Sequence, residues 1–135
     1  MFSLSVLLAA ACSSPGYSPF PLDLGDELPE DAFARCREVL LRRYETLTRS
    51  DADGFLLQTD WAASQDPPGE RRASVFRDPV VDGSLSVVVE LRRVKLPMFG
   101  LPGWTEPRGD PAAERELAEV LREALADPEP IGFSK

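Results

Sequence analysis

The feature that most constrains the fold is a pair of strand-like stretches, residues 71–77 and 84–96, separated by Asp82-Gly83. Apolar and polar residues alternate in the second stretch, which is the period of a half-buried β-strand. An Asp-Gly pair between two such stretches favours a tight hairpin turn. We therefore predict an antiparallel hairpin with one face toward a core. The expected core positions are Leu85, Val87, Val89 and Leu91, and the expected solvent positions are Ser86, Glu90 and Arg92, with Val88 among them.

A third strand is predicted from Phe55 to Trp61, because this stretch alternates in the same way. The positions expected to face the core are Phe55, Leu57, Thr59 and Trp61. The strand would end beside a Pro- and Gly-rich loop, residues 97–109, which carries Trp104. We expect this loop to fold over the end of the sheet and bury both tryptophans. The alternative is that Phe99 and Trp104 form an exposed patch that contacts a partner or lipid.

The segment "SDADG" before this strand resembles the middle of a calcium-binding loop. Such a loop needs an oxygen ligand at its first position, where this chain has the cation Arg49, and it leads into a helix rather than a strand. We therefore interpret "DADG" as a turn, in which Gly54 can supply a positive φ. No metal site is predicted.

Two amphipathic helices are predicted, at residues 29–47 and 110–127, because apolar residues recur there every three or four positions. Pro29 suits a first helical position, Asp110 suits an N-cap, and Pro128 stops the second helix. The expected apolar faces are Phe33, Cys36, Leu40, Tyr44 and Leu47 in the first helix, and Ala113, Leu117, Val120, Leu121 and Ala124 in the second. The expected solvated face of the first helix carries Arg35, Glu38, Arg42 and Glu45.

These elements predict an α+β fold, in which a three-stranded antiparallel sheet is flanked by two helices on one face. The order along the chain is helix–strand–strand–strand–helix. Each helix has one apolar face, so both are expected to cover the same face of the sheet. The chain has 135 residues and is 43% apolar, which suits one globular domain. We place that domain at residues 30–127, followed by a loose tail at 128–135.

Residues 1–11 are predicted to be a signal peptide. Positions 4–11 are uncharged and apolar or small, and they are too few to span a bilayer, which needs about 20. Cys12 follows three alanines, and this arrangement resembles a bacterial lipobox, in which the cysteine is acylated. Acyl chains then hold the protein to one leaflet. Secretion after cleavage behind the alanines, or an N-terminal helix buried in a cytosolic protein, remain as alternatives.

Residues 12–29, with the lipidated Cys12 at their start, are predicted to be a tether. The segment contains four prolines and two glycines, so it cannot form a helix and suits an extended linker between lipid and domain. Acylation of Cys12 would leave Cys36 without a disulfide partner, as a small buried residue. We therefore expect membrane attachment through the N-terminal lipid in the bacterial cell envelope, at the outer membrane facing the periplasm.

Charge and motifs limit the possible functions. The net charge is −8, and an acidic chain repels phosphates, so neither nucleic acid nor anionic lipid is expected to contact the whole surface. The sequence has no histidine, no G-x-S-x-G, no P-loop and no C-x-x-C. We therefore predict no catalytic residue, no cofactor and no enzymatic activity.

The order of elements resembles the helix-grip domains of envelope assembly lipoproteins of the BamC type. The shared features, over residues 12–127, are a lipobox, a Pro-rich tether, a helix leading into "DGFLLQTDW", an arginine-bounded strand "RRASVFR" and a closing helix. The most specific piece comprises Gly54, Thr59 and Trp61. The resemblance implies a periplasm-facing module that binds an envelope protein partner and has no catalytic site.

Two functions therefore remain open. The first is a lipid-anchored module that binds or scaffolds proteins, with Phe99 and Trp104 as candidate contact residues. The second is a carrier that holds a small apolar ligand or lipid between the helices and the sheet. A carrier would need a cavity of a few hundred Å³, which we would expect Phe33, Leu40 and Val89 to line.

Overall fold

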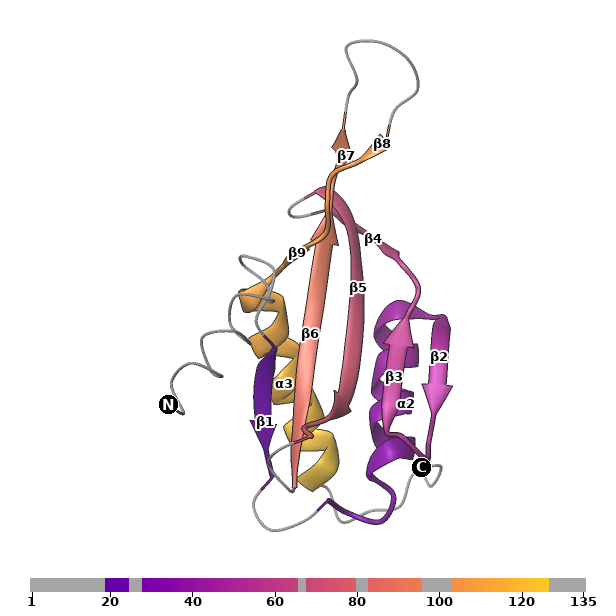
Figure 1. The fold of residues 1–135 in the computed structure, drawn as a ribbon, viewed down its shortest axis with the longest axis vertical. Coiled ribbons are helices and arrows are strands. Elements are labelled where there is room, and N and C mark those ends of the chain that lie inside the picture. The colour runs from indigo at the N-terminus through magenta and orange to yellow at the C-terminus, as the bar shows by residue number, and fades with distance from the viewer. Residues whose placement is uncertain (1–18, 25–27, 66–67, 80–82, 96–102, 127–135) are drawn as a thin grey trace, which may run out of the picture.

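The computed structural model describes residues 19–24, 28–65, 68–79, 83–95 and 103–126 (Figure 1). Within these ranges the helices are α2 (Ala32–Tyr44) and α3 (Pro111–Ala126). The strands are β1 (Phe20–Asp23), β2 (Leu47–Asp51), β3 (Leu56–Thr59), β4 (Ala62–Gln65), β5 (Pro68–Arg77), β6 (Ser84–Arg92), β7 (Val94–Lys95), β8 (Gly103–Trp104) and β9 (Arg108–Gly109).

The predicted α+β class and the two helices are confirmed, but the prediction of a three-stranded sheet is wrong. The main sheet has seven strands, with the order β1-β6-β5-β3-β2, while β4 pairs with β5 and β9 pairs with β6. All of these pairings are antiparallel. The strands that sequence reasoning missed have two to five residues. Such short segments carry too little alternation to be recognised, and they form because a longer neighbour offers a ladder of hydrogen bonds.

Strand β1 lies inside the segment that we expected to be a tether, so the folded domain begins before residue 30. Leu22 is fully buried opposite Leu85 of β6. Pro21 is exposed, and it is tolerated because β1 is an edge strand, where a missing N–H need not interrupt the sheet. A proline-rich segment can therefore still contribute one strand.

Both helices lie behind the sheet in Figure 1, as expected from their single apolar faces. One core cluster joins helices and sheet, and it contains Leu22, Ala32, Cys36, Val39, Leu40, Phe55, Leu57, Ala73, Val75, Leu85, Val87, Val89, Leu117, Ala118, Leu121 and Leu125. The predicted core positions Leu85, Val87 and Val89 are confirmed. Neither described helix lies on the opposite face of the sheet, which we call the open face (Figure 1). Ser86, Val88 and Glu90 lie on this face and were expected to contact solvent, but they are 7%, 1% and 6% exposed, so that expectation is wrong.

The first helix is shorter than predicted at both ends, because it begins at Ala32 and not at Pro29, and it ends at Tyr44. Glu45 follows with a positive φ of 70°, and its N–H donates to Leu41 O at 3.0 Å. The chain then enters β2 at Leu47, a residue that we had placed in the helix. The start of α3 agrees with the prediction, since Asp110 Oδ1 accepts a hydrogen bond from the N–H of Ala113 at 3.2 Å.

Arg35 is not on a solvated face, which corrects the prediction. It is 7% exposed; its Nε donates to Asp31 Oδ2 and its Nη1 to Ala124 O, both at 2.7 Å. A carbonyl in the last turn of a helix lacks an intrahelical partner, so Arg35 both satisfies the end of α3 and ties it to α2. Periodicity cannot reveal this role, because it depends on where α3 packs.

The "DADG" segment is a turn, as predicted, but it joins β2 to β3 and not a helix to a strand. Asp51 Oδ1 accepts hydrogen bonds from the N–H groups of Asp53 and Gly54, at 3.1 and 3.2 Å. This is the arrangement in which an aspartate side chain closes a turn on its own backbone. The positive φ, 48°, belongs to Phe55 and not to Gly54.

Candidate binding surface

Two arginine–glutamate pairs cross the open face between β5 and β6. Glu70 lies opposite Arg92, and Arg72 lies opposite Glu90. Arg92 Nη2 and Nε are 2.6 and 3.0 Å from Glu70 Oε1. Arg72 Nη2 and Nε are 2.9 and 3.1 Å from Glu90 Oε1. Each strand thus supplies one acid and one base, so the four charges balance locally.

A β-bulge brings Trp61 onto this face. Gln58 pairs with Ser74 and Ala62 pairs with Arg71, so three residues of the β3–β4 segment lie opposite two residues of β5. An extra residue reverses the alternation of side chains beyond it. The reversal occurs after Thr59, which is fully buried on the helix-covered side.

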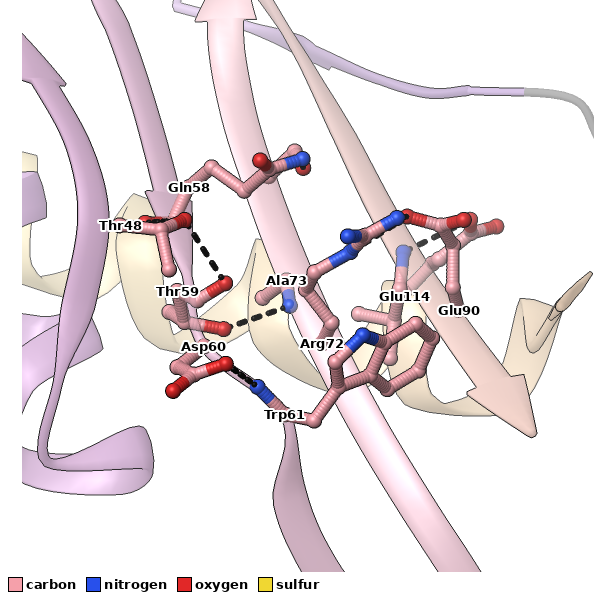
Figure 2. Close-up of polar contacts among 11 residues, drawn as sticks. Thr48, Gln58, Thr59, Asp60, Trp61, Arg72, Ala73, Glu90 and Glu114 are labelled. Carbon is pink, nitrogen blue, oxygen red and sulfur yellow. Dashed lines mark hydrogen bonds and ion pairs between the residues drawn. The ribbon is translucent and has the colours of Figure 1, made fainter. Parts of the chain in front are cut away.

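Hydrogen bonds hold the bulge in place, as Figure 2 shows. Thr59 Oγ1 accepts from the N–H of Ala73 at 2.9 Å, and it thereby replaces a backbone acceptor that the bulge removes from the ladder. Asp60 Oδ1 accepts from the N–H of Trp61 at 2.8 Å, while the N–H of Asp60 donates to Thr46 O at 2.9 Å. Trp61 therefore projects onto the open face beside Arg72 and not into the core (Figure 2), which corrects our prediction.

Two tryptophans and two arginines stack in sequence on the open face. The guanidinium carbon of Arg72 lies 4.5 Å from the ring centre of Trp61, and that of Arg92 lies 4.2 Å from the same ring. Arg92 also lies 4.4 Å from the ring centre of Trp104. The order is Arg72, Trp61, Arg92, Trp104, and we call this set the Arg–Trp stack. Cation–π contacts of this kind contribute about 0.5–1 kcal/mol each at exposed sites.

The stack ends at the β7–β8 hairpin, where apolar side chains are exposed. Trp104 is 43% exposed and Val94, its cross-strand partner, is 54% exposed. The expectation that the loop would bury Trp104 is therefore wrong. Trp104 remains a candidate contact residue, whereas Phe99 lies outside the described residues.

Two hollows open on the surface of the described residues. One, of about 400 Å³, is lined by Arg43, Tyr44, Ala62, Ala63, Ser64, Gln65 and Arg71. The other, of about 740 Å³, is lined by Leu91, Arg93, Lys95, Thr105, Glu106, Arg108, Gly109 and Asp110. Neither involves Leu40 or Val89, which are fully buried in the core.

The buried side chain of Glu114 accepts a hydrogen bond from β6 between the parts of β6 that pair with β1 and β9. Glu114 of α3 is 3% exposed, and its Oε2 accepts the N–H of Val89 at 3.0 Å. This N–H lies between the residues of β6 that pair with β1 and those that pair with β9. Burial raises the pKa of Glu114; the hydrogen bond from Val89 opposes that shift, and nearby Asp110 adds to it. The arrangement satisfies the sheet, and we assign Glu114 a structural role.

Of the two cysteines, only Cys36 lies within the residues that the structure describes. Cys36 is a free thiol buried in the core, as predicted, and burial raises its pKa to about 12. A thiol with so high a pKa is protonated at neutral pH and is a poor nucleophile. Cys12, the predicted lipidation site, lies outside the described residues.

One sequence signal could have revealed the open-face charges. Glu70 and Arg72 have the spacing E-x-R, and so do Glu90 and Arg92. These two motifs place opposite charges across from each other because the observed hairpin is centred on residue 81. The predicted tight turn at Asp82-Gly83 would have given a different register, so that part of the prediction is wrong. The position of Trp61 had no comparable signal, because a bulge leaves no mark in the apolar–polar pattern.

No protein-family model matches the chain, and no curated protein matches it. Neither described helix is long and apolar enough to cross a bilayer. Within the described ranges, no three His, Cys, Asp or Glu side chains are grouped so that they could hold a metal ion.

Proposed function

We propose that this protein is a lipid-anchored component of the bacterial cell envelope whose domain binds a protein partner through the open face. The observation that carries the proposal is the Arg–Trp stack, which lies on a sheet face that no described helix covers. Tryptophan and arginine are the residues most enriched at energetic centres of protein interfaces. The sequence before the domain supports the anchor, since Cys12 follows a short apolar segment and three alanines.

The chemistry of the open face defines the partner. Arg72 and Arg92 each use Nε and Nη2 on a single glutamate oxygen, so further guanidinium N–H groups remain for acceptors on a partner. The tryptophan rings offer apolar surface next to these donors. We therefore propose a partner protein with an apolar side chain flanked by backbone carbonyl or carboxylate oxygens. The two hollows described above are not lined by Phe33, Leu40 or Val89, so the carrier function has less support than the binding module.

Intact-mass measurement of the membrane fraction tests the anchor. We expect the mass of a chain cleaved before Cys12 and carrying acyl groups. Cys12→Ser should abolish both the acyl mass and retention in the membrane fraction. Equal membrane retention of the variant and the natural chain would overturn the anchor.

Site-specific photocrosslinking in cells tests the binding face. A benzoylphenylalanine at Gln58, which is half-buried on the open face, should give a discrete crosslinked product. The same probe at Arg122, which is exposed on α3, serves as the control. The crosslink from Gln58 should disappear in the background of Trp61→Ala. Equal crosslinking from both positions, or an unchanged product in Trp61→Ala, would contradict the proposed face.

A further inference from the structure

The end of the molecule that carries the β7–β8 hairpin is basic, although the chain as a whole has a net charge of −8. Arg93, Lys95 and Arg108 line one hollow there, of about 740 Å³. They come from separate parts of the fold, since Lys95 belongs to β7, Arg108 to β9, and Arg93 joins β6 to β7. A hollow lined by several cations suits an oxyanion.

These three cations differ from most arginines nearby in having no acidic partner among the described residues. Of the two carboxylates that line the hollow, Asp110 is engaged by Arg71 at 2.9 Å. Glu106 is the other, and it offsets one of the three positive charges. The hollow therefore keeps a positive balance, and Thr105 adds a hydroxyl group to its lining.

The hairpin beside this hollow exposes apolar side chains. Trp104 and Val94 are cross-strand partners and are 43% and 54% exposed. In Figure 1, β7 and β8 extend past the end of the main sheet and beyond both helices. A tryptophan next to cations at a protruding end is the combination found where proteins meet the headgroup region of a bilayer.

The direction of β1 allows a lipid anchor at the same end. β1 is antiparallel to β6, so the chain enters β1 from the side toward which β6 runs, that is, from the hairpin side (Figure 1). Phe20 lies opposite Val87, and Val94 follows seven residues later, about 23 Å farther along at the rise of a strand. The eight residues from Cys12 to Phe20 can span at most about 28 Å. An acylated Cys12 can thus reach the level of the hairpin.

We propose that the β7–β8 hairpin end is a second membrane contact, in which Arg93, Lys95 and Arg108 bind the phosphates of anionic lipid headgroups and Trp104 enters the interface. This inference rests on the proposed lipid anchor for its orientation. The charge distribution supports it, because the basic end is attracted to anionic lipid while the acidic remainder is repelled. Electrostatic forces fade over roughly 8–10 Å at physiological salt, so the nearest charges dominate.

A vesicle-binding assay tests the contact without relying on acylation. The full chain carrying Cys12→Ser is sedimented with vesicles of phosphatidylcholine alone or with 30% phosphatidylglycerol. We expect stronger binding to the anionic vesicles. Arg93→Gln combined with Arg108→Gln should weaken that binding roughly 25-fold, about fivefold for each arginine. Arg115→Gln combined with Arg122→Gln, at exposed positions of α3, makes the same change in net charge and should have little effect.

Two further readouts separate a membrane contact from a site for small free anions. Anionic vesicles should shift tryptophan emission to shorter wavelength, and Trp104→Phe should abolish the shift while Trp61 remains. Inorganic pyrophosphate at millimolar concentration should not release the protein from vesicles. Release by pyrophosphate would identify a site for small free anions and would overturn the membrane contact.

Failure of this inference is distinguishable from failure of the anchor. An acylated chain whose Cys12→Ser form ignores anionic vesicles, or loses binding equally in both double variants, would overturn the hairpin contact alone. Vesicle binding as predicted, in a protein whose intact mass shows no acyl group, would overturn the anchor alone.

Discussion

At the scale of single residues, Gly69 shows how closely β5 passes β6. A Cβ atom at this position would lie 2.3 Å from the carbonyl oxygen of Arg92, and the φ of Gly69 is +149°. Both the space and the backbone conformation therefore require glycine. The opposing atom belongs to the backbone of β6, which also holds Arg92 in the Arg–Trp stack, so it cannot move without disturbing the open face.

We predict that Gly69→Ala lowers the free energy of unfolding by at least about 2 kcal/mol, because it combines a clash with backbone strain. Gly103→Ala is the matched control, since a Cβ there has no heavy atom within 4 Å. Urea unfolding followed by circular dichroism measures both. A Gly69→Ala midpoint equal to that of Gly103→Ala would contradict the close approach of the two strands.

Glu114 gives a second prediction at this scale, which concerns pH. Burial raises the pKa of Glu114 above its ordinary value of 4.5, so the folded state holds this proton more tightly than the unfolded chain does. The stability that Glu114 contributes is therefore present in full below pH 4.5, and it is lost as the pH rises through the folded pKa. Glu114→Gln keeps an oxygen that can accept the N–H of Val89 but does not titrate.

Thermal unfolding between about pH 4 and 7.5 measures this effect. We expect Glu114→Gln to remove the part of the decline in stability with pH that the natural chain owes to Glu114. Glu119→Gln, at an exposed position of α3, removes the same charge and should keep that decline. Parallel curves for the natural chain and Glu114→Gln would show that the buried carboxyl does not set the pH dependence.

At the scale of elements, the bulge between β3 and β4 decides what Trp61 does. Without the extra residue, Trp61 would share a face with Leu57 and Thr59 and would be covered by helices. With the extra residue, the ring of Trp61 is half-buried on the open face, where the guanidinium carbons of Arg72 and Arg92 lie 4.5 and 4.2 Å from its centre. One inserted residue thus changes a core residue into a surface residue, and it assembles a stack that joins the β3–β4 segment to β5, β6 and β8.

We predict that Trp61→Ala destabilises the domain by about 1–2 kcal/mol, because it removes two cation–π contacts from a partly exposed ring. Truncation of a fully buried tryptophan would instead cost about 3–5 kcal/mol. Trp61→Phe keeps an aromatic ring and should recover part of the loss. Urea unfolding distinguishes the cases: an unchanged midpoint would exclude the stack as a stabilising element, and complete unfolding would place Trp61 in the core.

At the scale of the whole molecule, the fold has two ends and two faces with different characters. The helices cover one face, while the other presents paired charges and stacked rings. The β7–β8 end is basic in an otherwise acidic chain, and the chain enters β1 from the side of that end. The proposed lipid anchor, the proposed headgroup contact and the proposed protein-binding face are compatible in one orientation at a membrane, in which Trp104 belongs to the headgroup contact and Trp61 to the protein-binding face.

The sequence by itself determined the features that depend on local pattern. The α+β class, the β5–β6 hairpin, both helices, the N-cap at Asp110 and the buried Cys36 all follow from periodicity and turn chemistry, which act over a few neighbouring residues. The core positions of β6 also follow from alternation along the strand. The register between β5 and β6 does not, because their pairs are centred on residue 81 and not on the predicted tight turn at Asp82-Gly83. The exposure of Trp104 was only the alternative to the burial that we predicted from the sequence.

Only the tertiary structure decided the features that depend on a partner distant in the chain. The extra strands form because β6, β5 and β3 offer unpaired edges, Arg35 is buried because α3 ends beside it, and Glu114 is buried because β6 has a gap there. The bulge that places Trp61 on the open face likewise depends on how β3 and β4 pair with β5. The apolar–polar pattern of one strand does not specify how that strand pairs with its neighbours. The Arg–Trp stack and the basic end are therefore products of packing, because each joins residues from several strands that are neighbours only in space.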